Sequence, residues 1–328
     1  MESNNSLKFY KNNRQWYQLC KEIIKSITKD NSNIIYSLYL ESITQYHPLT
    51  ITESSLLISK YLQFKDAISL LEKSKNVIKE CNMYHGDFNI QIVHLEIQMC
   101  LYKIEIGEFK QIEKKLYEFK KMDLPVKVYE LYNFLGFKYF EKTGNIEYCI
   151  NYLINYIELS KDKTYYEILA KYTLISRKFF NFMRVYAFEG FSEIRINSIY
   201  EIVQNGETKR IEKEKNELKK IFTQEEVEIL IEKTYFIGLI NLCFKEKSRK
   251  IELSKIQEIL GINENDLNSF LVKAFGLNLL KGWIDEVKGI LYFSTILPRT
   301  LPKEELEKMK DKFGVWKRKV KEAISMLE

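Results

Sequence analysis

The sequence is poor in the residues that make turns. It has only 12 glycines and 4 prolines among 328 residues, and both numbers are far below average usage. Because a fold built of many short strands needs a turn every few residues, this scarcity predicts long helices instead. Hydrophobic residues make up 45% of the chain. It is therefore not disordered throughout, and it is long enough for two or three packed units.

Histidine is scarce as well, and the motifs of common enzyme classes are absent. The three histidines, His47, His85 and His94, have no cysteine or carboxylate at metal-ligand spacing. There is no HExxH, P-loop or GxSxG motif. The adjacent carboxylates Asp285 and Glu286 fall in a predicted strand, where neighbouring side chains point to opposite faces. The sequence predicts no enzymatic activity, no metal and no cofactor.

The cysteines and the apolar runs indicate a cellular compartment. No CxxC pair occurs, and the number of cysteines is odd, which favours reduced thiols in the cytosol or nucleus. The five are Cys20, Cys81, Cys100, Cys149 and Cys243. The polar stretch Met1 to Lys11 lacks the apolar core of a signal peptide. The longest apolar run, Tyr235 to Phe244, is too short to span a bilayer. We expect a soluble cytoplasmic and nuclear protein without membrane contact.

Amphipathic helices are predicted in succession from about residue 16 to residue 191. A weak internal repeat lies among them: Tyr102 precedes Gly107 as Tyr139 precedes Gly144, at an offset of 37 residues. Glycine supplies the positive φ that ends one helix before the next begins. A period in the mid-thirties is the size of one helical hairpin, and such hairpins bury their apolar faces by stacking.

The C-terminal third changes character. A short helix over 255–260 ends at Gly261, and a second helix runs from Asn263 to Lys281, where Gly282 is expected to end it. Two strands follow, Trp283 to Val287 and Ile290 to Ser294, joined by a tight turn. Two helices followed by a hairpin give the order of a winged helix, which we predict over residues 234–298.

Winged helices often bind DNA, but the second helix here does not favour it. Between Asn263 and Lys281, Glu264 and Asp266 balance the two lysines, and no arginine is available to read guanine. Another use of a hairpin is its open edge, where the strand of a different subunit can pair. We predict such an interface at Trp283, Ile284, Asp285, Leu291, Tyr292 and Phe293.

A long helix is predicted from Pro302 to about Leu327. Its apolar residues recur at alternating steps of three and four, which is typical of a coiled-coil seam. They are Leu306, Met309, Phe313, Trp316, Val320, Ile324 and Leu327. Such a seam needs a partner surface. It could bind other subunits, or it could fold back on its own domain.

These C-terminal segments resemble the PCI-domain family, and within it the lid subunits of the proteasome regulatory particle. The resemblance is strongest between residues 266 and 316. It is carried by Leu271-Val-Lys-Ala274, Ile284-Asp-Glu-Val287, Pro298-Arg299, Met309-Lys-Asp311 and Trp316. It implies a mainly α fold with three parts: a helical repeat arm over 1–160, a PCI domain over 161–298 and a C-terminal assembly helix over 299–328. The segment between Tyr200 and Glu228 is shorter than the usual family form.

The resemblance implies a structural role rather than a reaction. Such subunits form a horseshoe joined through their winged helices, and their C-terminal helices enter a bundle shared with the lid deubiquitinase pair. A von Willebrand-type ubiquitin receptor lies near subunits of this type. The expected function is therefore support of ubiquitin-dependent degradation through lid assembly. The alternative is a nucleic-acid, translation-factor or signalosome adaptor on the same scaffold, against which the Ile-Asp-Glu-Val and Pro-Arg runs favour the proteasome.

Overall fold

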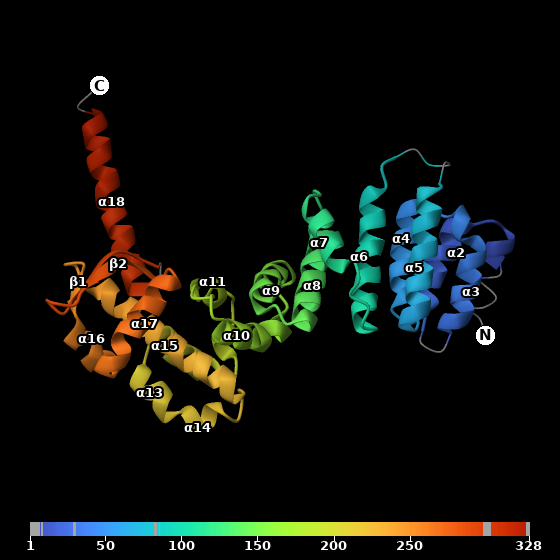
Figure 1. Ribbon diagram of the computed structural model, residues 1–328. Helices are drawn as coiled ribbons and strands as arrows, with labels where there is room; N and C mark the ends of the chain where they lie inside the picture. Colours follow the sequence, from blue (N-terminus) through green and yellow to red (C-terminus); the bar gives the residue numbers. More distant parts are fainter. Residues whose placement is uncertain are drawn as a thin grey trace. The chain divides into compact units, whose positions relative to one another are not determined.

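The computed structural model describes residues 7, 9–28, 31–81, 84, 86–297 and 303–325 (Figure 1). The chain divides into two compact units, residues 1–161 and 162–328. Helices dominate both units, and the second also holds a small sheet of three strands. The predicted mainly α fold, with a winged helix in its C-terminal part, is confirmed.

The first unit is a succession of helices that pack on helices one or two positions away in sequence. Contacts between α4 and α5, α5 and α6, α6 and α8, and α8 and α9 hold it together. The helices are α2 (Trp16–Ser26), α3 (Ser32–Ser42), α4 (Pro48–Ser59), α5 (Phe64–Lys79), α6 (Asn89–Glu105), α7 (Ile112–Lys120), α8 (Val126–Thr143) and α9 (Ile146–Ser160). The two repeat glycines follow α6 and α8 with φ of 80° at Gly107 and 76° at Gly144. Each ends its helix in the left-handed conformation, as the repeat predicts.

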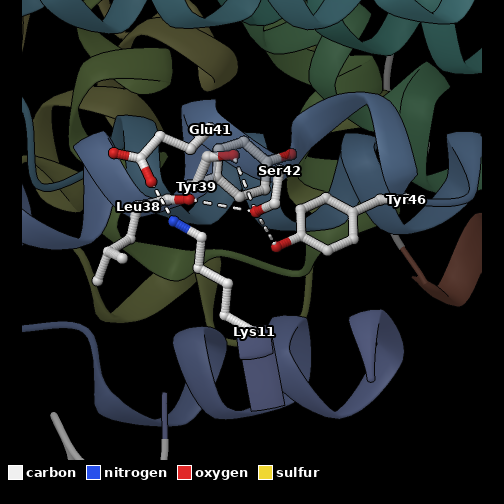
Figure 2. A network of polar contacts seen from close by, with 6 residues as sticks. All are labelled: Lys11, Leu38, Tyr39, Glu41, Ser42 and Tyr46. Carbon is white, nitrogen blue, oxygen red and sulfur yellow. Dashed lines mark hydrogen bonds and ion pairs between the residues drawn. The ribbon is translucent and has the colours of Figure 1, made fainter. Parts of the chain in front are cut away.

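Small hydroxyl side chains join α3, α4 and α5. The buried Tyr39 hydroxyl lies 2.8 Å from Ser54 Oγ and 2.9 Å from Ser55 Oγ, and Ser55 Oγ lies 2.7 Å from Ser74 Oγ. Figure 2 shows a second group of contacts on α3, where Ser42 Oγ lies 2.6 Å from the Tyr46 hydroxyl. Buried polar groups are costly unless they are hydrogen-bonded, so these pairs let polar atoms enter the core without penalty.

All five cysteines lie within the described residues, and none forms a disulfide. Four are buried, and Cys81 is the half-buried exception. Burial raises the pKa of the Cys20 thiol to about 11 and that of Cys149 and Cys243 to about 12. It also raises the pKa of Cys100. These four thiols are therefore both protonated and shielded at neutral pH.

We expect one thiol, Cys81, to react quickly with Ellman's reagent at about pH 8, because the thiolate is the nucleophile. The other four should react only in denaturant. Absorbance at saturation counts the thiols in each phase. Cys81→Ser should remove the fast phase and leave the slow phase unchanged. A second fast thiol in the folded protein would contradict the burial of the remaining four.

The second unit begins with helices around the long helix α15 (Gln224–Lys245). They are α10 (Tyr166–Ile175), α11 (Met183–Tyr186), α12 (Asn197–Asn205), α13 (Thr208–Lys213) and α14 (Lys215–Leu218). A capping box starts α15: Glu226 N–H donates to Thr223 Oγ1, and Thr223 N–H donates to Glu226 Oε2. Gly206 ends α12 beside Gly238, where a Cβ on Gly206 would lie 2.5 Å from Gly238 Cα. This close approach leaves no room for a side chain.

The winged helix follows in the predicted order, with one strand that the sequence analysis missed. The elements are β1 (Lys250–Glu252), α16 (Leu253–Leu260), α17 (Glu264–Gly276), β2 (Leu280–Asp285) and β3 (Ile290–Ile296). The sheet is antiparallel with strand order β1-β3-β2. The C-terminal helix α18 (Lys303–Ser325) completes the described chain.

The expectation that Gly282 ends the second helix is wrong. Helix α17 already ends at Gly276, and Asn278 adopts a positive φ of 55° after it. Gly282 instead lies inside β2, at a bulge in its pairing with β3. A Cβ there would lie 1.9 Å from Tyr292 O. Glycine is needed at this position because the backbone of the neighbouring strand occupies the space of a side chain.

Candidate assembly surfaces

The central strand of the sheet is β3, so it is not one of the edge strands that the sequence predicted. Leu291 pairs with Ile251 of β1 on one side and with Ile284 of β2 on the other. Phe293 N–H also donates to Arg249 O at 3.0 Å. The placement of Leu291, Tyr292 and Phe293 on an open edge is therefore wrong. Leu291 and Phe293 are core residues, 0% and 4% exposed, because β1 covers the side that a two-strand hairpin would leave open.

The outer strands of the sheet are β1 and β2, so of the two predicted hairpin strands only β2 keeps an open edge. Among the described residues, no strand pairs with the side of β2 that faces away from β3. Trp283 is 61% exposed, and its ring stacks on Tyr292 with centroids 5.2 Å apart. Lys250 pairs with Tyr292 from the opposite side, so the three side chains form a row on one face of the sheet. The edge of β2 and this row make one continuous surface, to which Trp283 contributes both backbone and ring.

Asp285 serves the turn rather than the open surface. Its carboxylate accepts a hydrogen bond from Lys288 N–H at 3.0 Å and pairs with Lys288 Nζ at 3.2 Å. These hydrogen bonds from Lys288 lower the pKa of Asp285. The carboxylate is thereby held against its own hairpin, where it fixes the β2–β3 connection.

Helix α18 exposes every side chain that the structure describes on it, namely those of residue 307 and residues 309–325. Five of the predicted seam residues are among them: Met309, Phe313, Trp316, Val320 and Ile324, from 39% to 65% exposed. The Leu306 side chain and Leu327 lie outside the described residues. Because none of the described seam side chains packs on the rest of the chain, folding back is not what this structure shows. Exposed apolar residues that gather along one helix face mark an interaction surface.

A cavity beside α17, the helix that enters the major groove in a DNA-binding winged helix, has a mainly acidic charged lining. It has a volume of about 460 Å³ and lies between α16, the start of α17 and the β2–β3 turn. Its charged lining residues are Glu252, Glu264, Glu286 and Lys288. Three carboxylates against one ammonium repel a polyanion instead of neutralising it.

The structure describes two of the three histidines, and one of them caps a helix. His47 Nδ1 accepts a hydrogen bond from Leu49 N–H at 3.2 Å and so caps α4. Burial lowers the pKa of His94, and His85 lies outside the described residues. Within the described part of the chain, no three His, Cys, Asp or Glu side chains are grouped to hold a metal ion. No described helix is long and apolar enough to cross a membrane.

Sequence reasoning missed two features of this unit. One is β1, whose three residues are too few to show an alternating pattern, although Ile251 is buried between exposed Lys250 and Glu252. The other is Lys233, a lysine within the apolar stretch of α15 that is only 2% exposed. Lysine is rarely buried without a partner, but Lys233 follows Glu232 in the sequence, so nothing in the local pattern distinguishes it from an exposed lysine.

Comparison with known proteins agrees with this architecture. Residues 181–295 match the PCI domain. Along 99% of its length the chain is 23% identical to 26S proteasome non-ATPase regulatory subunit 13 homolog B of Arabidopsis thaliana, of which the alignment covers 92%. It is 29% identical to 26S proteasome non-ATPase regulatory subunit 13 of Dictyostelium discoideum over 30% of this chain and 26% of that one. It is 26% identical to 26S proteasome regulatory subunit RPN9 of Saccharomyces cerevisiae over 30% of this chain and 25% of that protein. The chain therefore contains a PCI domain over residues 181–295, and along nearly its whole length it is similar to regulatory subunit 13 of the 26S proteasome.

Proposed function

We propose that the chain is a non-catalytic structural subunit of the lid of the proteasome regulatory particle. It supports ubiquitin-dependent protein degradation through lid assembly. The observation that carries this proposal is the similarity to a non-ATPase regulatory subunit over 99% of the chain. The PCI domain over residues 181–295 supports it, since the match spans the winged helix with its open strand edge.

Each exposed surface has a proposed partner. The edge of β2 around Trp283 takes a strand or loop of a neighbouring PCI subunit, because an unpaired edge offers main-chain hydrogen bonds. The seam of α18 enters a helical bundle with other lid subunits, among them the deubiquitinase pair. We also propose that the chain contacts the ubiquitin-receptor subunit. We propose further that it is located in both cytoplasm and nucleus.

The alternative of a nucleic-acid adaptor is less well supported. The acidic cavity beside α17 repels phosphate, and the named relatives are proteasome subunits. The similarity to those subunits also favours the proteasome over the translation-factor and signalosome assemblies.

Deletion of residues 303–328 tests the proposal. Because every described side chain of α18 is exposed, the truncated protein should fold with unchanged stability of the remaining chain. It should nevertheless fail to enter the regulatory particle. Tagged full-length and truncated chains are expressed in cells and purified under native conditions, and their partners are identified by mass spectrometry. Lid subunits recovered equally with both chains would contradict the assignment of α18.

A further inference from the structure

The second unit contains a pocket that neither assembly surface includes. It has a volume of about 360 Å³ and lies between the loop after α10, the middle of α15 and the end of α17. Its apolar lining residues are Phe180, Ile229, Phe236 and Leu277, and its charged ones are Arg177, Glu232, Lys233 and Lys273. A concave site with a mainly apolar lining and a few convergent polar groups is the usual form of a ligand site.

Cations outnumber anions at this pocket. Lys273 Nζ pairs with Glu232 Oε1 at 3.0 Å, so these two charges offset each other. The Lys233 ammonium donates to backbone carbonyls within the fold. Arg177 is exposed and forms no ion pair with any residue that the structure describes. Its guanidinium is thus the cation available to a ligand, and carboxylates bind guanidinium in a bidentate manner.

The apolar lining continues beyond the pocket. Phe180 and Phe236 are 8% and 3% exposed and form the interior, whereas Leu277 is 37% exposed at the mouth. Val272, one turn before Gly276 on the same side of α17, is 62% exposed. The pocket itself holds about 360 Å³. A ligand that fills it and also covers Val272 must extend beyond it, as a polypeptide segment can.

We propose that this pocket binds a segment of a partner polypeptide in which a bulky apolar side chain stands next to a carboxylate. The apolar side chain fills the space between Phe180 and Phe236, and the carboxylate pairs with Arg177. The next residues of the segment cover Val272. The proposal concerns a site apart from the β2 edge and the α18 seam, so it holds or fails independently of the proposed function.

Direct binding to the full-length chain tests it. The probe is a fluorescein-labelled hexapeptide with one phenylalanine followed by two glutamates, and fluorescence anisotropy measures its affinity. A matched peptide with glutamines in place of both glutamates should bind about tenfold more weakly, because it loses the charge-assisted hydrogen bonds. Arg177→Glu should lower the affinity for the acidic probe by about tenfold or more, because the guanidinium that pairs with the carboxylates is replaced by a like charge. Lys178→Glu makes the same charge change on a neighbouring exposed residue and should alter affinity by about twofold at most.

Gly276 allows a test that does not remove charge. A Cβ added at Gly276 meets nothing within 4 Å, so Gly276→Leu should fold and place its side chain in the pocket mouth. It should abolish binding of the acidic probe. Gly314→Leu is the matched control, because its added Cβ also meets open space, on α18. Equal binding of both peptides, or undiminished binding to the Gly276→Leu variant, would overturn the proposal. So would binding of adenosine monophosphate at this pocket when the acidic peptide does not bind.

Discussion

Replacing Lys233 with methionine should lower the free energy of unfolding of the 162–328 unit by about 3 kcal/mol. The Lys233 side chain is 2% exposed. Its ammonium donates to Thr173 O at 2.6 Å and to Ser176 O at 2.8 Å. It also lies 5.2 Å from the centre of the Phe180 ring and 5.1 Å from that of Phe182. Methionine keeps most of the volume but leaves both carbonyls without this donor.

The size of this effect follows from where the two carbonyls lie. Helix α10 ends at Ile175 with Ser176 as its C-cap residue, and the last carbonyls of a helix have no partner within it. The helix dipole gives this end a partial negative charge, which a lysine complements. Lys233 thus joins the C-terminal end of α10 to the middle of α15, and the aromatic faces add a cation–π attraction.

Lys171 provides a matched control on the same two helices. It also reaches from α10 to α15, where it pairs with Glu226 at 3.5 Å, but its side chain is 40% exposed. Lys171→Met should cost less than about 1 kcal/mol, because exposed ion pairs contribute little. Urea denaturation followed by circular dichroism, with hydrogen exchange of α10 and α15 amides, compares the two variants. If the two variants lost the same free energy of unfolding, the buried Lys233 ammonium would not stabilise the junction of α10 and α15.

The sequence predicted those parts of the fold that depend on local signals. Gly107 and Gly144 end helices with positive φ, as glycine does wherever a helix must stop and the chain reverse. The winged helix followed from the order of two short helices and a hairpin, and α18 from the spacing of its apolar residues. Each of these signals lies within a stretch of about 30 residues and depends on periodicity or turn chemistry.

Features that depend on distant partners could not be predicted in this way. Lys233 contacts carbonyls 57 and 60 residues earlier in the chain, and no local pattern indicates that pairing. The same holds for β1, which lies beside β3 only after α16 and α17 have folded between them. Without β1, β3 passes for an edge strand, and Leu291 and Phe293 were assigned to a surface although they are buried. In the sequence, a glycine that ends a helix cannot be told from a glycine at a β-bulge. Only the close approach of Tyr292 O in the folded chain shows that Gly282 is of the second kind.

The second large effect is expected at α18 when the apolar seam is made acidic. The double variant Phe313→Glu with Trp316→Glu should reduce recovery of the chain in the regulatory particle by about tenfold or more. Buried aromatic anchors in an interface each contribute about 2 kcal/mol or more, and a carboxylate in their place is buried without a partner. The stability of the isolated chain should change by less than about 0.5 kcal/mol, because these side chains are 59% and 65% exposed.

Val315→Glu separates the face of α18 from the helix itself. Val315 is apolar and 44% exposed on the same helix, but at about 100° per residue it lies well away from the line through Met309, Phe313 and Trp316. A seam that packs into a bundle of helices tolerates a charge at Val315 and rejects one at Phe313 or Trp316. Quantitative mass spectrometry of lid subunits co-purified with each variant measures this difference. If Val315→Glu impaired incorporation as strongly as the double variant, α18 would be enclosed on all sides, and a coiled-coil seam would not describe its contact.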